Sequence, residues 1–246
     1  MTRVVSRFPR PVREIENLFI PLPDGCRLAA RLGMPADAAR DPVPALLAYL
    51  PYRKRAGTAA RDALTHPYFA GHGYAAVRVD MRGNGDSDGL MWDEYLKQEQ
   101  DDALAVIAWL RDQPWCTGRV GMIGISWGGF NGLQVAARAP EGLDAVVTIA
   151  STVDRYGDDI HYKGCLLLKN FGWSAVMQSY SSRPPDPAMV GTRWRDMWLE
   201  RLNHQPLLIE NWLAHQRRDS FWKHGSVAED YGAIKAAVLT LSLIHI

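Results

Sequence analysis

One serine of this chain stands in a setting that could make it a nucleophile. Gly124-Ile125-Ser126-Trp127-Gly128 matches the pattern G-x-S-x-G, with an apolar run before it and an amphipathic run after it. A serine on a tight turn between a strand and a helix exposes its Oγ at the carboxyl end of a sheet. The following helix N-terminus would direct N–H groups at an oxyanion. The pattern predicts a nucleophile at Ser126; the alternative is an ordinary glycine-rich loop.

A tyrosine at the end of another apolar run could serve the same site. Tyr52 lies in "LPYRKR", where the run from Ala45 to Pro51 ends. Open α/β sheets bind their ligands at the carboxyl ends of the strands. The Tyr52 hydroxyl could therefore donate to a tetrahedral oxyanion, together with the backbone N–H of Trp127. A packing role for a partly buried Tyr52 fits the pattern equally well.

The elements that would position these residues alternate along the chain up to Thr152. Short apolar runs bounded by Gly, Pro and Asp are typical of strands buried on both faces. "LKQEQDDALAVIAWLRDQ" has apolar residues at helical spacing, and a second helix is expected from Gly129 to Arg138. The alternation predicts an α/β fold with a mostly parallel sheet and helices on both faces. The expected strands are residues 29–34, 45–51, 74–80, 119–125 and 144–151.

The composition changes after residue 153. Residues 154–232 contain helical, tryptophan-rich segments, including one continuous run from 193 to 216, and a linker "SSRPPDPAM". We predict a core in residues 1–153, a helical cap in 154–232, and the start of a returning core strand in 233–246. Tryptophans at helical spacing usually pack in a core, so none is assigned to a substrate. They are Trp173, Trp194, Trp198, Trp212 and Trp222.

Four segments together resemble the cocaine-esterase / X-Pro dipeptidyl-peptidase family of α/β-hydrolases, which includes the α-amino acid ester hydrolases. They are "PYRKR", "VRVDMRGNGDSDG", "WCTGRVGMIGISWGG" and "DRYGDDIHYKG", in the order expected of the family. The resemblance covers about residues 15–235. It implies an α/β-hydrolase fold with a helical cap, Ser126 as nucleophile, and an oxyanion hole made by Tyr52 and the Trp127 N–H. It implies no cofactor and no metal.

The resemblance also implies a binding site for an ammonium group. In the α-amino acid ester hydrolases, carboxylates near the segment "DRYGDDIHYKG" hold the substrate's ammonium group. Asp158 or Asp159 would have that role here. The alternative, which we prefer at this point, is that Asp154, Asp158 and Asp159 cap a helix and supply first-turn charge.

A serine nucleophile of this kind requires an acid and then a base later in the chain. In the family that the chain resembles, the Asp follows the strand after the cap, and the His comes later still. Here no Asp follows Asp230, and His245 alone stands in the tail. We therefore predict a chain truncated before the end of the sheet, with little or no activity by itself. The cap histidines are expected on the surface or in packing: His161, His204, His215 and His224.

The segment "RGNGDSDG" suggests two ligand sites and fits neither. Asn84, Asp86 and Asp88 begin like a calcium loop, but the required Glu would fall at Tyr95. Its glycines also lack the spacing of a dinucleotide fingerprint. We interpret the segment as a turn that shapes the floor near the serine.

Composition limits the partners. The chain has 28 Lys and Arg against 27 Asp and Glu, without the clustered basic face that nucleic-acid binding needs. No signal peptide and no membrane span is expected. The three cysteines have no metal or redox spacing, which is typical of a cytoplasmic protein.

The sequence thus predicts a serine hydrolase acting on a small ester, an amide or a short peptide. It leaves the substrate and the oligomeric state open. Two alternatives remain: a non-catalytic α/β module that binds a ligand or partner under the cap, and complementation by a second polypeptide that supplies the rest of the triad.

Overall fold

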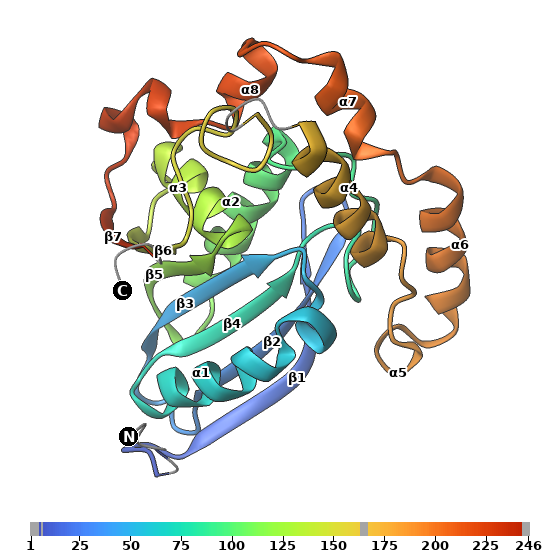
Figure 1. The fold of residues 1–246 in the computed structure, drawn as a ribbon. Helices are drawn as coiled ribbons and strands as arrows, with labels where there is room; N and C mark the ends of the chain where they lie inside the picture. The colour runs from blue at the N-terminus through green and yellow to red at the C-terminus, as the bar shows by residue number, and fades with distance from the viewer. Residues whose placement is uncertain (1–4, 6, 163–166, 243–246) are drawn as a thin grey trace.

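The computed structural model describes residues 5, 7–162 and 167–242, and a single mixed sheet forms their centre (Figure 1). The strand order is β1-β2-β4-β3-β5-β6-β7. β1 and β2 pair with their neighbours antiparallel, and the pairs from β4 to β7 are parallel. The predicted mostly parallel sheet is confirmed. The strands are β1 (Val12–Pro21), β2 (Arg27–Pro35), β3 (Val43–Leu50), β4 (Ala75–Asp80), β5 (Cys116–Ile125), β6 (Leu143–Ile149) and β7 (Ala237–Leu241).

Helices pack on both faces of the sheet, as predicted. α1 (Ala59–Gly71) packs against β2 and β4 on one face, and α2 (Lys97–Arg111) and α3 (Trp127–Ala137) pack on the other. α3 begins two residues earlier than expected, directly after Ser126. On the α1 side, a groove of about 580 Å³ runs along β3, β5 and β6.

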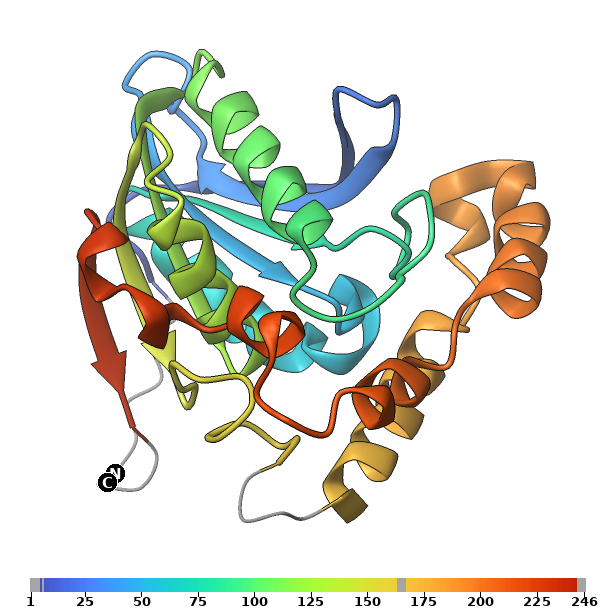
Figure 2. The same ribbon diagram turned by 90° about the horizontal axis from the view of Figure 1, so that it is seen from above.

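The cap is an arc of short helices at the carboxyl ends of the strands (Figures 1 and 2). The prediction of one continuous helix over residues 193–216 is wrong in one respect, because residues 205–207 interrupt the helix. Gln205 is extended (ψ 126°) because Pro206 follows it. Residues 155–162 are turns rather than helix. The helices are α4 (Leu167–Ser181), α5 (Pro187–Val190), α6 (Trp194–His204), α7 (Leu208–Ala214) and α8 (Ser220–His224).

After the cap the chain adds a further strand to the sheet. β7 pairs parallel to β6, with Ala237 opposite Ala145 and Leu241 opposite Ile149. Every residue of β7 is exposed, so it is the open edge of the described sheet. His245 lies outside the described residues. Over the residues that the structure describes, no helix is long and apolar enough to cross a bilayer.

Candidate active site

Ser126 occupies the turn between β5 and α3. Its backbone has φ 55° and ψ −119°, a conformation uncommon for a residue other than glycine. Strain of this kind clusters at functional sites, where surrounding contacts hold it. Those contacts are present: Ser126 N donates to Ile149 O at 2.9 Å, and the N–H groups of Gly129 and Phe130 donate to Ser126 O.

The glycines around the serine leave little room for a Cβ atom. A Cβ on Gly124 would lie 2.3 Å from the backbone carbon of Gly128, and one on Gly128 would lie 2.3 Å from Leu50 Cδ2. A Cβ on Gly129 would lie 2.6 Å from Ser151 Oγ. The first turn of α3 therefore packs directly against its neighbours.

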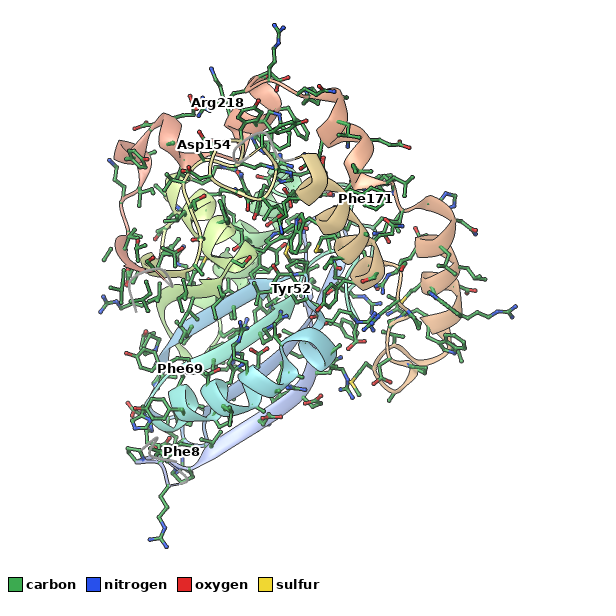
Figure 3. The ribbon with its side chains drawn as sticks, viewed as in Figure 1. Phe8, Tyr52, Phe69, Asp154, Phe171 and Arg218 are labelled. Carbon is green, nitrogen blue, oxygen red and sulfur yellow. The ribbon has the colours of Figure 1, made fainter. Side chains whose placement is uncertain are left out.

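Tyr52 follows β3 and faces the serine turn. Its hydroxyl lies close to the side chain of Ser126 and to the backbone N–H of Trp127, and both of these groups lower its pKa. Its ring packs against Trp173 and Tyr180, with centroids 6.4 and 5.7 Å away. Figure 3 shows Tyr52 at the boundary between the sheet and α4. Burial raises its pKa to about 12, so the phenol stays protonated and can donate at neutral pH.

A buried carboxylate lies behind Trp127. Glu99, in the first turn of α2, accepts hydrogen bonds from Trp127 Nε1 at 2.8 Å and Asn131 Nδ2 at 3.2 Å. It also accepts from the backbone N–H of Tyr95 at 2.8 Å. Burial raises its pKa to about 7, against the effect of these donors. Glu99 thus ties α2 to the first turns of α3.

A second buried carboxylate joins the core to the cap. Glu94 lies in the segment between β4 and α2 and is fully buried. It accepts from His161 Nε2, from Arg155 Nε at 3.3 Å and from Trp173 Nε1 at 3.0 Å. Burial alone would raise its pKa, but the charge and hydrogen bond of His161, together with Arg155 and Trp173, hold the pKa at about 2.

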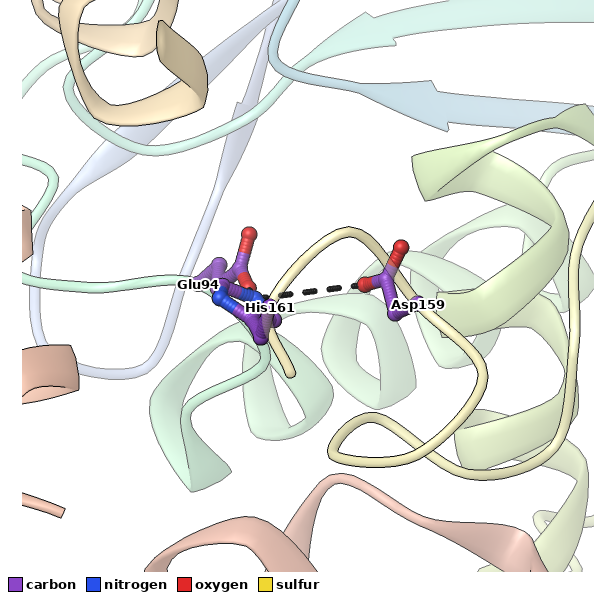
Figure 4. Close-up of side chains that lie close together, drawn as sticks. All are labelled: Glu94, Asp159 and His161. Carbon is purple, nitrogen blue, oxygen red and sulfur yellow. Dashed lines mark hydrogen bonds and ion pairs between the residues drawn. The ribbon is translucent and has the colours of Figure 1, made fainter. Parts of the chain in front are cut away.

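Asp158 and Asp159 differ in their surroundings. Asp158 is exposed, whereas Asp159 faces the Glu94–His161 pair, with Oδ2 4.0 Å from His161 Nε2 (Figure 4). Burial, and then the negative charge of Glu94, raises the pKa of Asp159 to about 6. The expected capping role falls to Asp154, which accepts from two backbone N–H groups of a turn rather than of a helix.

Glu94, Asp159 and His161 are close enough to suit a metal ion, with ligand atoms all within 4.8 Å of one another. Arg155 already places a buried positive charge against Glu94. Its guanidinium also lies 3.6 Å from Asp93. A second cation beside this guanidinium would be repelled. The donor set therefore fits an ion-pair network better than a metal site.

The described histidines of the cap bond to groups other than Ser126 or are exposed. His161 is fully buried, and its two ring nitrogens contact Glu94 and Asn170. His215 pairs with Asp219 at 2.6 Å, and His204 and His224 are exposed. Within residues 7–162 and 167–242, no hydrogen bond joins a histidine to Ser126. The packing and surface roles expected of these histidines agree with this geometry.

The fold and the serine turn together define a class of protein. A CocE/NonD family hydrolase from Staphylococcus aureus has the same fold, with 20% identity and a TM-score of 0.68, over 91% of this chain and 39% of that one. An α-amino acid ester hydrolase also has a TM-score of 0.68, with 22% identity, over 98% of this chain and 44% of that one. The chain is an α/β-hydrolase in fold, as predicted.

The sequence comparisons then give the family. The sequence model of the X-Pro dipeptidyl-peptidase (S15) family matches residues 24–242, so the chain belongs to this family. It is 31% identical over 249 residues to the cocaine esterase of Rhodococcus sp. (strain MB1 Bresler). This match covers 91% of the chain and 42% of the esterase, so the chain spans less than half the length of that relative. The predicted family resemblance is confirmed.

Three buried charged residues of the site region were not singled out from the sequence, whereas Trp173 was expected to pack in a core. Lys54, Glu94 and Glu99 are charged yet buried, and Trp173 lies between Tyr52 and Trp127. The only available signal was the position of Lys54 beside Tyr52 in "PYRKR". Neighbours distant along the chain determine the burial of the two glutamates.

Proposed function

We propose that the complete protein is a serine hydrolase that cleaves an ester or amide bond through an acyl-enzyme. Ser126 Oγ attacks the carbonyl carbon, and the Tyr52 hydroxyl and Trp127 N–H stabilise the oxyanion. The alcohol or amine then leaves, and water releases the acid and restores Ser126. One observation carries the proposal: a serine at positive φ faces a protonated phenol and a helix N-terminus.

The acid and base of the triad belong to the same proposal. None of the described histidines contacts Ser126, and the chain spans 42% of the cocaine esterase. We propose that the Asp and His come from residues outside these 246, on the same polypeptide or a second one. Because loss of triad members costs several orders of magnitude in rate, the chain alone would hydrolyse substrates slowly or not at all.

For the substrate we propose a small ester, an amide or a short peptide that carries an ammonium group. Asp159 supports this proposal better than the exposed Asp158 does. Its carboxylate is largely buried, it lies near the negative Glu94, and among the described residues the cationic group paired with it is His161, at 4.0 Å. An arriving ammonium group would relieve this unfavourable charge.

Labelling with a fluorophosphonate probe tests the nucleophile. The chain is incubated with the probe, with and without added imidazole as a substitute base, and the modified peptide is identified by mass spectrometry. We expect label on Ser126, faster with imidazole, and none in Ser126→Ala. Tyr52→Phe should slow labelling roughly 100-fold, the effect of losing one oxyanion donor.

Two results would contradict the proposal. Equal labelling of Ser126→Ala would place the reactive group elsewhere. A folded chain, checked by circular dichroism, that takes no label even with imidazole would favour the non-catalytic binding module.

A further inference from the structure

The turn that carries Tyr52 is held by a buried lysine. After Tyr52, residues Arg53–Gly57 form a single π-helical turn (η1), and Arg53 has φ 60°. Lys54 in this turn is fully buried. Its Nζ lies 2.6 Å from Asp86 Oδ2 and 3.5 Å from Asp80 Oδ2, and its backbone N–H donates to Asp80 Oδ1 at 2.5 Å. Side chain and backbone of one residue are thus both fixed.

Stability alone does not account for this arrangement. Burying an ammonium group and two carboxylates carries a large desolvation penalty, and apolar replacements of such groups are often as stable. Short π-helical turns occur frequently at functional sites. The residue that this turn presents is Tyr52, whose hydroxyl contacts Ser126.

One of these aspartates, Asp86, connects the turn to the cap. Asp86 Oδ1 accepts from the backbone N–H of Asp186, in the cap, at 2.8 Å. Arg201 of α6 donates to Gly85 O at 3.0 Å and to Ser87 O at 2.8 Å. The "RGNGDSDG" segment therefore lies between the turn that carries Tyr52 and the cap.

We propose that Lys54, bound by Asp80 and Asp86, is a positioning residue that fixes the Tyr52 hydroxyl against Ser126. Lys54 does not touch the reacting atoms and acts through Tyr52. The consequence for the reaction rests on the proposed function, whereas the placement of Tyr52 can be measured without it.

The first test observes Tyr52 directly. 3-Fluorotyrosine is incorporated at position 52, and its ¹⁹F resonance is recorded in the full chain and in Lys54→Met. We expect Lys54→Met to shift and broaden the resonance. The matched control is Arg111→Met, which breaks the Arg111–Glu141 pair (2.6 Å) and should leave the resonance in place.

The second test measures coupling through the fluorophosphonate labelling rate. We expect Tyr52→Phe to slow labelling about 100-fold and Lys54→Met about tenfold or more. If Lys54 acts through Tyr52, the double variant is no slower than Tyr52→Phe. Independent effects would multiply to about 1,000-fold, and that result would overturn the proposal.

The two tests separate the proposals. If Ser126→Ala labels as fast as the parent chain, the proposed function fails, and the ¹⁹F resonance still decides the role of Lys54. An unchanged resonance in folded Lys54→Met overturns the positioning role even where labelling behaves as expected. If Lys54→Met does not fold, Lys54→Met/Asp86→Asn, which removes both charges, replaces it. Failure of both variants to fold would assign Lys54 to stability alone.

Discussion

The substitution Glu94→Gln should release the cap from the core. Glu94 is fully buried, and its hydrogen-bonding partners His161, Arg155 and Trp173 all belong to the cap. The glutamine side chain would keep the shape but leave Arg155 and His161 facing a neutral amide. Removing one partner of a buried ion pair typically costs about 3–5 kcal/mol, a large part of the roughly 5–15 kcal/mol that stabilises a domain.

The pH dependence of stability gives a second, independent signature. Burial lowers the pKa of His161, but the charge of Glu94 outweighs burial and raises it above 6.5. The stability that His161 contributes is therefore complete below pH 6.5 and is lost as pH rises through the folded pKa. Glu94 has a pKa of about 2, below its ordinary 4.5, so its contribution is lost as pH falls from 4.5.

Without Glu94, the effect of His161 on the pH dependence of stability should reverse. In Glu94→Gln the buried imidazole lies beside Arg155 with no anion bonded to it, so its pKa should fall below 6.5. The stability of this variant relative to the parent chain should then increase from about pH 6 to about pH 8. Urea unfolding followed by circular dichroism at the two pH values measures the difference.

Asp159→Asn is the matched control, because the expected sign is opposite. The pKa of Asp159 is about 6 against an ordinary 3.8, so its ionisation destabilises the fold as pH rises from 3.8 to 6. At pH 7 this pKa difference corresponds to a destabilisation of the fold by at most about 3 kcal/mol. Asp159→Asn should be as stable as the parent chain or more stable. The reasoning is refuted if both variants lose the same stability, or if Glu94→Gln unfolds at the parent's urea concentration.

Two further substitutions test the turn at Ser126 and its support. Gly124→Ala places a Cβ 2.3 Å from the backbone carbon of Gly128, and such overpacking should cost about 1–3 kcal/mol. An unchanged melting temperature would contradict the close approach of α3 to β5. Glu99 has a pKa of about 7 rather than 4.5, so the parent chain should lose stability as pH rises from 4.5 to 7. Glu99→Gln should remove part of that loss of stability. If urea unfolding shows the same pH dependence of stability in the parent chain and in Glu99→Gln, the effect assigned to the burial of Glu99 is refuted.

The parallel part of the sheet could be predicted because its strands carry their signal locally. β3, β4 and β5 are short apolar runs bounded by turn residues; most residues of β3 and β4 are buried, and β5 alternates buried with half-buried residues over its second half. β1 was not predicted, since this edge strand reads VREIENLFIP and is mostly half-buried or exposed. A register shift between Ile15 and Leu18 also breaks its alternation.

The candidate reacting groups carry a signal in the local sequence, and the residues that support them do not. Ser126 is marked by glycines within its own turn, and Tyr52 by its place at the end of a strand. Glu94 reads as an ordinary polar residue before a helix, and its partner His161 stands 67 positions later. Burial of a charge depends on such distant partners, which local spacing does not encode.

The buried carboxylates of the site region argue for a division of roles. Glu99 accepts three N–H groups, one of them from Trp127, and Glu94 accepts donors from His161 and two other cap residues. Among the described residues, Asp159 has one backbone donor, the N–H of Ile160, and one cationic neighbour, His161, at 4.0 Å. A largely buried acid with so few partners destabilises the chain unless something else pairs with it. Asp159 is therefore the carboxylate from which we expect recognition of a charged substrate, whereas Glu94 and Glu99 maintain the geometry in which that recognition occurs.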